Sequence, residues 1–476
     1  MTLSSKDTAT SIGATNYIER IKRLASTNKN LKEQFEELAN RFSAIQEQNR
    51  NYQELLLKFS PEPEMGKSKE ARKSARRLRM ISILYVGISG FQDLYKSEDP
   101  IKMIDWLDEL NLKIEEIAFQ HNILTIKSLG DATLFATGLQ GENRTNAIDI
   151  IQVALEMQHF VNSMREKNPS FIWSLKIAVH TGSVLAIPES KNHPTYSFSG
   201  ENLTTAVRLG ETADSSGITT SVMTYQLAKE FFEGSLIGKM PAKYMGTLNV
   251  YKIEGWIPEF KDVANPHIPN HAFSVKYEHI KFIDLEEEML DYLEKHLPKN
   301  LYYHNVKHTI DVITEVELIG WAEGVSEEEL LILKLAALFH DAGHTISYSN
   351  HEYHSTVMAR EKMYSYDFPH EHIEEVCKLI MVTQLPPKPT TILEEIMCDS
   401  DLDYLGRTDF IPVSNNLYAE LKEQNLVNSF NEWNKRQLKF IKEHQYFTKT
   451  ALKLREVNKQ KQIERLNQLI EEGNYG

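Results

Sequence analysis

The stretch LLILKLAALFHDAGH, residues 330–344, decides how the C-terminal part of the chain folds. Its first ten residues are almost all apolar, and they lead directly into an adjacent histidine and aspartate, His340 and Asp341. A second histidine, His344, follows one helical turn later. A carboxylate buried behind such a helix needs a cation or a strong hydrogen-bond partner, because an unpaired buried charge is strongly destabilising. A metal ion meets that need if other parts of the chain supply more ligands.

Other pieces of the same helical segment carry suitable ligands. YYHNVKH places His304 and His308 four residues apart, on one face of a helix. MCDSDLDYLG offers Asp399, Asp401 and Asp403 after an apolar helical run. A single histidine usually caps a helix or completes a core, but several such pieces in one domain favour a metal. Imidazoles combined with carboxylates suit Zn, Fe or Mn better than an all-oxygen Mg or Ca site. A carboxylate bridging to a second ion would give a two-metal site that aims hydroxide at phosphorus.

Length and composition limit the classes of protein. A chain of 476 residues is expected to form two or three domains. Its net charge of −14 argues against a nucleic-acid partner bound by broad electrostatic attraction. Cys377 and Cys398 form neither a disulfide framework nor a zinc-finger spacing, which favours a reduced, cytoplasmic setting. No apolar run approaches the ~20 residues that span a bilayer, so we expect no membrane partner.

The N-terminal region predicts a coiled coil. After a tail expected to be disordered, residues 1–16, apolar residues recur at alternating gaps of three and four through residues 17–60. Asn28 and Asn49 fall at the same heptad position as Ile21, the a position. A polar residue there sets the register and favours a parallel two-stranded coil. A lone amphipathic helix would not need five sustained heptads without Pro or Gly, so we expect a homodimer.

The remaining chain divides into two domains with different patterns. Strand-like and helix-like segments alternate over residues 78–257, whereas residues 273–476 are almost only helical. Residues 258–272 contain three prolines and are expected to be a linker. The predicted fold class is therefore multi-domain α+β, with an N-terminal coiled coil, an α/β domain and an all-α domain.

The helical domain resembles the HD superfamily of metal-dependent phosphohydrolases, and more narrowly the class I cyclic nucleotide phosphodiesterases. YHNVKH is similar to their YHN-x-x-H motif, and HDAGH followed by Asn350 to their HD-x-x-H…N motif. The resemblance implies that His304 is the general acid and that His344 lies beside the hydroxide between two ions. It also implies that Asp341 bridges the two metals. The ligands implied for the first metal are His308, His340, Asp341 and Asp401.

RQLKFI resembles a further segment of that family, Q-x-x-F-I. Gln437 would then read the purine and Phe440 would stack on it. The implied cofactors are two divalent ions: Zn, Fe or Mn at the first site, and Mg or Mn at the second. The chain departs from the animal enzymes in a shorter stretch between Asp341 and Asp401. His351 and His354 are candidate extra ligands of the second metal, as in some bacterial HD hydrolases.

The α/β domain resembles the class III adenylyl and guanylyl cyclase domain, which implies a ferredoxin-like fold. The matching segments are ILYVGISGF, IKSLGD, LKIAVHTGSV and SGENLTTAVRL, in the family's order and spacing. Cyclisation needs two carboxylates to hold two magnesium ions on the triphosphate. The resemblance assigns one of them to Asp131, but Gly87 stands at its partner's position. Thr204 replaces the ribose-orienting asparagine and Met245 the triphosphate-binding lysine, whereas Arg208 keeps the position of the transition-state arginine.

With three of five catalytic positions changed, we expect this domain to be inactive as a cyclase. Lys127 and Ser197 align with the base-reading positions of the family. The domain could therefore bind a nucleotide effector without turning it over, or act only as a dimeriser, and the sequence leaves both readings open.

The sequence thus predicts a soluble homodimeric phosphodiesterase that hydrolyses 3′,5′-cyclic AMP or GMP to the 5′-monophosphate. A dimeric pseudo-cyclase domain would regulate it. One alternative is a bifunctional cyclase–phosphodiesterase, for which Asp93 is the only nearby replacement carboxylate. The other is a non-enzymatic nucleotide-binding scaffold whose metals are structural.

Overall fold

The computed structural model describes residues 76–96, 99–139, 143–188, 196–242 and 246–473. The predicted coiled coil, residues 17–60, and the N-terminal tail, residues 1–16, lie outside these residues and remain predictions. None of the described helices is long and apolar enough to cross a bilayer.

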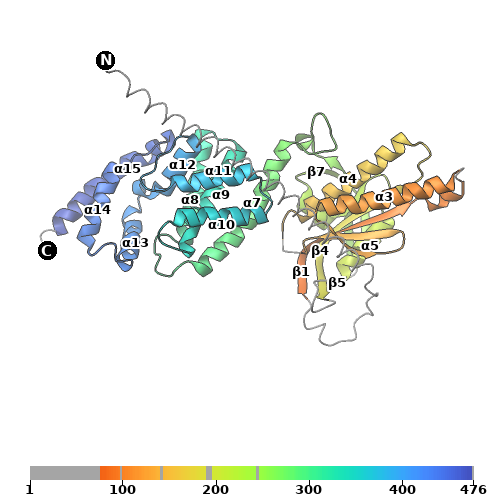
Figure 1. Ribbon diagram of the computed structural model, residues 1–476, viewed down its shortest axis with the longest axis horizontal. Helices are drawn as coiled ribbons and strands as arrows, with labels where there is room; N and C mark the ends of the chain where they lie inside the picture. The colour runs from red at the N-terminus through yellow and green to blue at the C-terminus, as the bar shows by residue number, and fades with distance from the viewer. Residues whose placement is uncertain (1–75, 97–98, 140–142, 189–195, 243–245, 474–476) are drawn as a thin grey trace, which may run out of the picture. The chain divides into compact units, whose positions relative to one another are not determined.

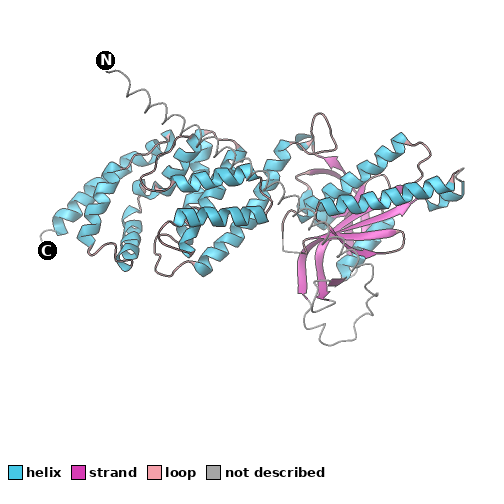
Figure 2. Ribbon diagram, viewed as in Figure 1, coloured by secondary structure: helices cyan, strands magenta, loops and turns pink. Residues whose placement is uncertain are grey.

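The first domain is an α+β domain built on a mixed sheet (Figure 2). Its strands are β1 (Arg76–Ser89), β2 (Leu124–Ser128), β3 (Ala132–Thr137), β4 (Ser174–Pro188), β5 (Tyr196–Ser199), β6 (Ile218–Ser221), β7 (Phe232–Ala242) and β8 (Gly246–Trp256). Its helices are η1 (Phe91–Lys96), α3 (Pro100–Gln120), α4 (Asn146–Lys167), α5 (Glu201–Thr212), α6 (Val222–Ala228) and η2 (Pro258–Phe260). The strand order is β2-β3-β1-β4-β6-β8-β7, with β5 paired to β4. The β1-α3-β2-β3-α4-β4 run is the ferredoxin-like arrangement, so the predicted α+β domain is confirmed.

Strand β1 lies at the centre of this domain, between β3 and β4. Successive side chains of a strand point to opposite faces of the sheet. Leu84 and Val86 therefore enter the core under α3 and α4, whereas Ile83 and Tyr85 enter the core on the other face, with α5. Burial on both faces explains why the sequence of β1 is a nearly continuous apolar run rather than an alternating one.

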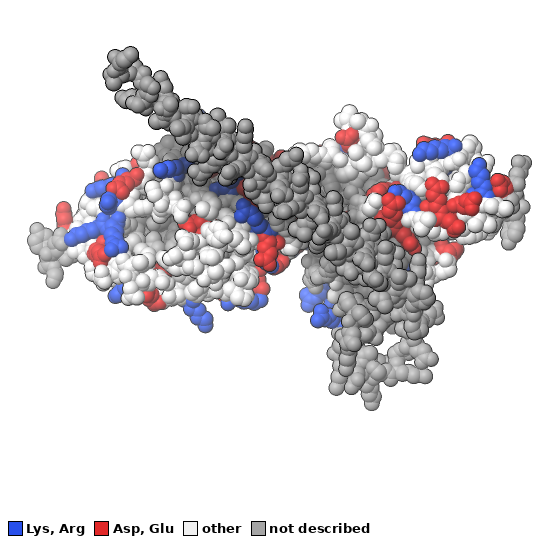
Figure 3. Space-filling model, in the orientation of Figure 1, with Lys and Arg blue, Asp and Glu red and all other residues white. Residues whose placement is uncertain are grey.

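The second domain is all-helical, as predicted (Figure 1). Its α-helices are α7 (His271–His296), α8 (Val306–Glu323), α9 (Glu327–Phe339), α10 (His351–Ser365), α11 (His370–Val382), α12 (Ile392–Asp401), α13 (Phe410–Glu423), α14 (Phe430–Glu443) and α15 (Lys449–Gly473). Two 3-10 turns, η3 (Ala342–Thr345) and η4 (Asp403–Gly406), follow α9 and α12. On the face shown in Figure 3, acidic and basic side chains are interspersed over the described residues of this domain.

Helix α9 is the central helix of the second domain. A capping box starts it, in which Ser326 and Glu329 bind each other's backbone amides. From Leu330 to Phe339 every residue except Lys334 is buried. A helix that is apolar on all sides belongs in a core, so the last turn of α9 delivers the residues that follow it into the interior.

Helix α7 is shared by both cores. Phe273 is part of the first domain's core, and Tyr277 packs against it. Phe282 and Leu285, one to two turns later on the same helix, belong to the core of the second domain. In the segment predicted to be a linker, residues 258–272, Phe260 is buried in the first core, whereas Val263 is 99% exposed. Helix α7 follows this segment and carries residues of both cores.

Polar contacts join the start of α4 to α7. The backbone amide of Arg144 donates to Asp284 Oδ2 at 2.9 Å, and its guanidinium pairs with both Asp284 and Glu287. About two turns earlier on α7, the Tyr277 hydroxyl donates to Asp149 Oδ1 at 2.6 Å. These contacts bind α4 of the first domain to the helix that enters the second.

Asp284→Ala should lower the free energy of unfolding by about 1–2 kcal/mol, because the backbone amide and guanidinium of Arg144 lose a buried acceptor. Urea unfolding followed by circular dichroism measures the change. The control, Asp291→Ala, removes an exposed pair with Lys295 on the same helix and should cost less than about 0.5 kcal/mol. Equal effects of the two substitutions would contradict the importance of the Arg144 contact.

Candidate functional site

The end of α9 fixes the first imidazole of the site. His340 is 1% exposed, and its Nδ1–H donates to the carbonyl oxygen of Ala337 at 2.8 Å. This bond leaves Nε2 unprotonated when the ring is neutral, which is the form that binds a metal. Helix α9 ends at Phe339. Asp341, which directly follows His340, turns its carboxylate into the same interior space.

Four residues from three helices converge at this point. His308 Nε2 lies 3.2 Å from Asp401 Oδ1 and 3.3 Å from His340 Nε2. Asp341 Oδ2 lies 3.3 Å from His340 Nε2 and 3.5 Å from His308 Nε2. Two ligand atoms at about 2.1 Å from one ion, at a tetrahedral angle, are roughly 3.4 Å apart. The spacing therefore fits a single divalent ion, and these are the four residues that the resemblance assigned to the first metal.

The other oxygen of Asp341 faces a second group of imidazoles. Asp341 Oδ1 lies 3.4 Å from His351 Nε2 and 3.9 Å from His344 Nε2. The rings of His344 and His351 stack with centroids 4.0 Å apart. Both ring nitrogens of His344 are buried without a hydrogen-bond partner. Burial lowers the pKa of His344 to about 3, so this ring is neutral and able to act as a ligand.

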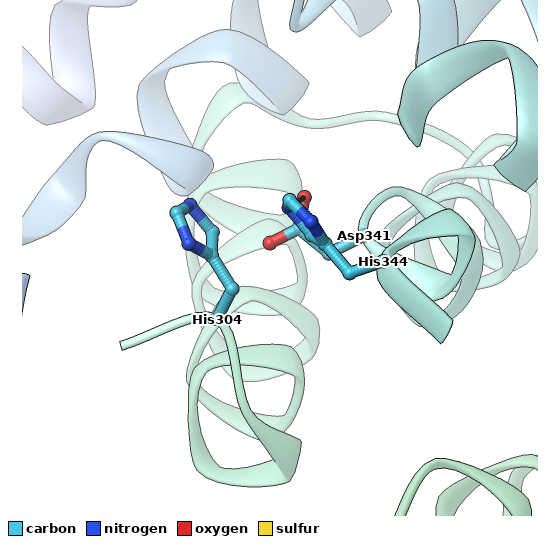
Figure 4. A group of neighbouring side chains, drawn as sticks. All are labelled: His304, Asp341 and His344. Atoms are coloured by element: carbon cyan, nitrogen blue, oxygen red, sulfur yellow. Dashed lines mark ion pairs between the residues drawn. The ribbon is translucent and has the colours of Figure 1, made fainter. Parts of the chain in front are cut away.

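His304 lies across from Asp341 and His344 (Figure 4). One potential ligand atom of each of these three residues lies within 4.8 Å of the others. His304 comes from the segment before α8, whereas the other two come from the turn after α9. The site is thus closed from two sides, with His304 facing the carboxylate that both imidazole groups share.

Glu420, a fully buried carboxylate of α13, holds His304 in position. Its Oε1 accepts the Nδ1–H of His304, and its Oε2 accepts the backbone amides of Tyr303 and His304 at 3.0 and 3.1 Å. Tyr348 also donates its hydroxyl to Oε1, at 3.2 Å. The Nδ1 bond leaves Nε2 of His304 without this partner, on the other side of the ring.

These carboxylates set the charge of His304. Burial disfavours the imidazolium, but nearby Asp341 and the bond to Glu420 outweigh it, so the pKa of His304 is raised. Burial likewise opposes ionisation of Asp341, yet His340 and His304 hold the pKa of its carboxyl well below the usual range. The site thus pairs Asp341, a carboxyl whose pKa is held low, with His304, an imidazole whose pKa is raised.

Glu420 has no recognisable signal in the sequence. It lies more than a hundred residues from His304 in a stretch, YAELKE, that resembles any amphipathic helix. Only the tertiary fold brings α13 against the segment before α8. Acidic residues in helices are usually exposed, so a glutamate on the buried side of α13 would have been only a weak signal of a functional residue.

Gly343 allows helix α10 to approach the turn after α9 that contains His340 and Asp341. A Cβ on Gly343 would lie 2.0 Å from the carbonyl oxygen of His351. Ser355 of α10 accepts the amide of Gly343 at 2.8 Å and donates to the carbonyl of His340 at 2.7 Å. The first turn of α10 is therefore held against η3, which brings His351 to Asp341. His354, one turn further, is not among the residues that line the cavity of this site.

Only one of the three aspartates of MCDSDLDYLG faces the metal ligands. Asp399 accepts the backbone amide and hydroxyl of Thr448, both at 2.8 Å, and so anchors the segment before α15. Asp403 pairs with Arg455 of α15. Asp401 alone turns toward His308 and His340.

A cavity of about 670 Å³ opens beside the imidazole clusters. His304, Asp341, His344 and His351 line it at one end, and Leu417, Trp433, Gln437 and Phe440 line it elsewhere. Gln437 is buried; its Oε1 accepts the Ser414 hydroxyl at 2.6 Å, and its Nε2 has no hydrogen-bond partner. The two residues predicted to contact a purine thus share one cavity with the candidate metal ligands.

The cyclase-like domain has its own cavity, of about 310 Å³, which Gly87 and Asp131 both line. The Tyr85 ring fills the space beside Gly87: a Cβ there would lie 2.9 Å from Tyr85 Cε1. Burial, together with the charges of Asp131 and Glu211, raises the pKa of the Tyr85 hydroxyl. A neutral aromatic ring therefore occupies the space into which a side chain at position 87 would extend.

The other residues that align with the nucleotide site of the cyclase family lie outside that cavity. Lys127, Arg208 and Thr204 are exposed. Ser197 on β5 donates to the carbonyl of Ile187 at 3.5 Å. None of these four lines the cavity that Asp131 and Gly87 share. Met245 lies outside the described residues.

Comparisons with known proteins agree with this division. Residues 74–255 match the adenylate and guanylate cyclase catalytic domain, and residues 305–404 match the HD domain. The receptor-type guanylate cyclase gcy-28 of Caenorhabditis elegans is 25% identical over 267 residues, which is 55% of this chain and 20% of the relative. Guanylyl cyclase C of Cavia porcellus is 27% identical over 252 residues, which is 52% of this chain and 23% of the relative. The chain therefore spans about a quarter or less of the length of these relatives.

Among solved structures, similar chains include the adenylyl cyclase CyaB from P. aeruginosa, 16% identical, with a TM-score of 0.34, covering 38% of this chain and 95% of that one. The adenylate/guanylate cyclase/hydrolase from Silicibacter pomeroyi is 19% identical, with a TM-score of 0.30, covering 39% of this chain and 99% of that one. On the two domain matches, the chain carries a class III adenylate/guanylate cyclase catalytic domain followed by an HD domain.

Proposed function

We propose that the HD domain is a metal-dependent phosphodiesterase that converts 3′,5′-cyclic AMP or GMP to the 5′-monophosphate. One observation carries the proposal. The two oxygens of the buried Asp341 carboxylate face two different groups of imidazoles, with the spacing that a pair of divalent ions requires.

The donor atoms fit the proposed ions. His308, His340, Asp341 and Asp401 would hold the first, and two nitrogens with two oxygens suit Zn, Fe or Mn. Asp341 Oδ1 would hold the second, for which the sequence predicted Mg or Mn. When bound, two such ions supply an activated water and neutralise charge on the phosphoryl group.

The chain's own residues supply the acid. Hydrolysis joins a water oxygen to phosphorus and breaks the bond from phosphorus to O3′, which then needs a proton. His304, held by Glu420 through Nδ1, would give that proton from Nε2. Glu420 fixes the ring orientation and keeps the imidazolium charged until transfer, as a carboxylate does for a catalytic histidine. Asp401 and Asp341 remain ionised throughout.

The cavity favours a nucleotide over a smaller phosphodiester. A cyclic phosphate at the Asp341 end leaves room for a base near Gln437 and Phe440. The buried Nε2 of Gln437 lacks a partner, and a purine acceptor would supply one. The ring of Phe440 offers a stacking surface in the same cavity.

His304→Ala should slow hydrolysis of cyclic AMP or GMP by about 10²–10⁴-fold and leave the bound metal unchanged. Hydrolysis of bis(4-nitrophenyl) phosphate should fall far less, because nitrophenolate leaves without a proton. The measurements are kcat on both substrates and metal content by mass spectrometry.

His296→Ala, an exposed histidine on α7, serves as the control and should match the wild type. If kcat falls equally on both substrates, His304 is not the general acid. If the variant also loses bound metal, His304 is a metal ligand. If no phosphodiester is cleaved by the wild-type protein with Mn, Mg, Zn or Fe, the metals are structural and the scaffold alternative holds.

We further propose that the cyclase-type domain has lost cyclase activity and regulates the phosphodiesterase as a homodimer. Gly87 offers no metal ligand, and the Tyr85 ring leaves no room for one without moving. A nucleotide bound without turnover near Lys127, Asp131, Ser197 and Arg208 would be the effector. Helix α7, shared by both cores and adjacent to η3, supports a route from this domain to His344. A ligand can shift activity only by its differential affinity for two states, typically ~1–3 kcal/mol.

The cyclase-type domain should form no cyclic product from ATP or GTP, with Mg or Mn. The assay uses full-length Asp341→Ala protein, so that the HD site cannot destroy a product, and detects cyclic nucleotides by mass spectrometry. If the Asp341→Ala protein forms cyclic product and the Asp131→Ala, Asp341→Ala double variant does not, the cyclase-type domain is active. That result would favour a bifunctional enzyme.

A further inference from the structure

The carboxylate of Asp401 lies at the point where helix α12 ends. The helix runs to Asp401, Leu402 caps it, and the 3-10 turn η4 begins at Asp403. Helix ends fray more easily than helix interiors, because their last carbonyl groups lack intrahelical partners. The direction of this side chain therefore depends on the contacts that hold the residues on either side of it.

The residue two positions before Asp401 is fixed by the segment that leads into α15. Asp399 is fully buried, and its carboxylate accepts the backbone amides of Phe447 and Thr448 at 3.0 and 2.8 Å. The hydroxyl of Thr448 donates to Asp399 Oδ2 at 2.8 Å. These hydrogen bonds hold the last turn of α12 against the start of α15.

Arg455 of α15 holds the other side. Its guanidinium pairs with Asp403, two residues after Asp401, and its Nη2 lies 3.1 Å from Oε1 of Glu315. Glu315 belongs to α8, the helix that also carries His308. One side chain of α15 therefore joins the turn after Asp401 to the helix of His308, a second proposed ligand of the first ion.

The contact between α15 and η4 is close enough to exclude a side chain. A Cβ on Gly406 would lie 2.7 Å from the carbonyl oxygen of Arg455 and 2.8 Å from its Cα. About two turns further along α15, the amide of Gln462 donates to the carbonyl oxygen of Arg407 at 3.1 Å. Packing and a second hydrogen bond thus fix η4 to α15 in addition to the Arg455 charge.

We propose that Arg455 is a positioning residue for the first metal ion. By joining η4 to α8, it places the Asp401 carboxylate beside His308 and so sets the affinity for that ion. Helix α15 carries none of the four proposed ligands, yet it controls how well they bind. The proposal rests on the first metal site of the function proposed above.

The charges around Arg455 explain why its loss would move the ligands. The side chains of Asp403 and Glu315 are 3% and 14% exposed, and both pair with the same guanidinium. Two carboxylates in a poorly solvated place repel each other strongly when their shared cation is removed. Each would then turn toward water, and η4 would separate from α8.

A small separation is enough to weaken the binding of an ion. Asp401 Oδ1 lies 3.2 Å from His308 Nε2, a spacing that fits two ligands of one ion. Metal–ligand distances tolerate changes of only about 0.2 Å. Loss of a group that orients a ligand typically lowers metal affinity about 10–100-fold. His344 and His351 lie on η3 and α10, so only one of the two ions should be affected.

The experiment measures metal affinity and needs no catalysis. Full-length protein is stripped of metal and titrated with Zn in competition with a chromophoric chelator. The wild type should bind about two Zn per chain, and Arg455→Met should bind one of them about 10–100-fold more weakly. The rise in melting temperature on adding Zn should shrink as well, because an ion that binds the folded state stabilises it.

Three further variants separate the possible causes. Arg455→Lys keeps the charge but not the planar fork of the guanidinium, so it should recover part of the affinity. Gly406→Ala keeps every charge, and its Cβ should weaken the same ion by pushing η4 away from α15. Lys453→Met, exposed on the same helix, is the matched control and should bind Zn like the wild type. If Arg455→Met does not fold, Arg455→Lys and Gly406→Ala still provide the test.

Asp401→Asn tests whether Arg455 acts through this ligand. In the Asp401→Asn protein, Arg455→Met should lower the Zn affinity little further, because the effects of residues that act as a unit are not additive. A merely structural role would give the same fold loss in both backgrounds, and that result would overturn the proposal. So would wild-type Zn affinity in both Arg455→Met and Gly406→Ala.

These results are separate from the enzymatic proposal. The predicted changes in Zn affinity, in a protein that hydrolyses no cyclic nucleotide, would refute the function and support the role of Arg455. Hydrolysis by the wild type, with unchanged Zn affinity in the variants, would support the function and overturn the role of Arg455.

Discussion

The buried carboxylate of Asp341 is the constraint on which the second domain depends. Helix α9 is apolar on all sides and ends deep in the core, so it delivers a negative charge to a place where little water reaches it. Five histidines surround that charge, at positions 304, 308, 340, 344 and 351. Three of them are held by separate contacts: a backbone carbonyl for His340, Glu420 for His304, and the close approach at Gly343 for His351. Such cost in buried polarity is characteristic of a functional site.

The first domain has a different kind of polar site. Both faces of its strand β1 are packed, and the cavity that Asp131 lines also contains Gly87, with the Tyr85 ring beside it. The proposed loss of cyclase activity rests on this cavity and not on the fold, because a fold does not determine a function. What joins the two domains is α7, whose apolar residues serve one core and then the other without a break. A continuous helix of this kind is the element through which the proposed regulation would act.

Local patterns predicted the fold classes and the HD cluster, because ligands spaced by one helical turn are visible in a sequence. Contacts between distant segments were not visible. Glu420 reaches His304 only through the placement of α13. The three prolines of residues 258–272 suggested a linker, yet Phe260 packs into the first core. Gly87 was read as a lost ligand, but only the fold reveals that Tyr85 fills the space beside it.

The most direct test of the account is product analysis in ¹⁸O-labelled water. Full-length protein loaded with Mn is incubated with cyclic AMP and cyclic GMP, and the products are identified by mass spectrometry. The account predicts a 5′-monophosphate with one ¹⁸O on phosphorus, and no product with Asp341→Ala, because that carboxylate serves both ions. Intact cyclic nucleotides after incubation with the wild-type protein, or full turnover by Asp341→Ala, would contradict the proposed two-metal phosphodiesterase.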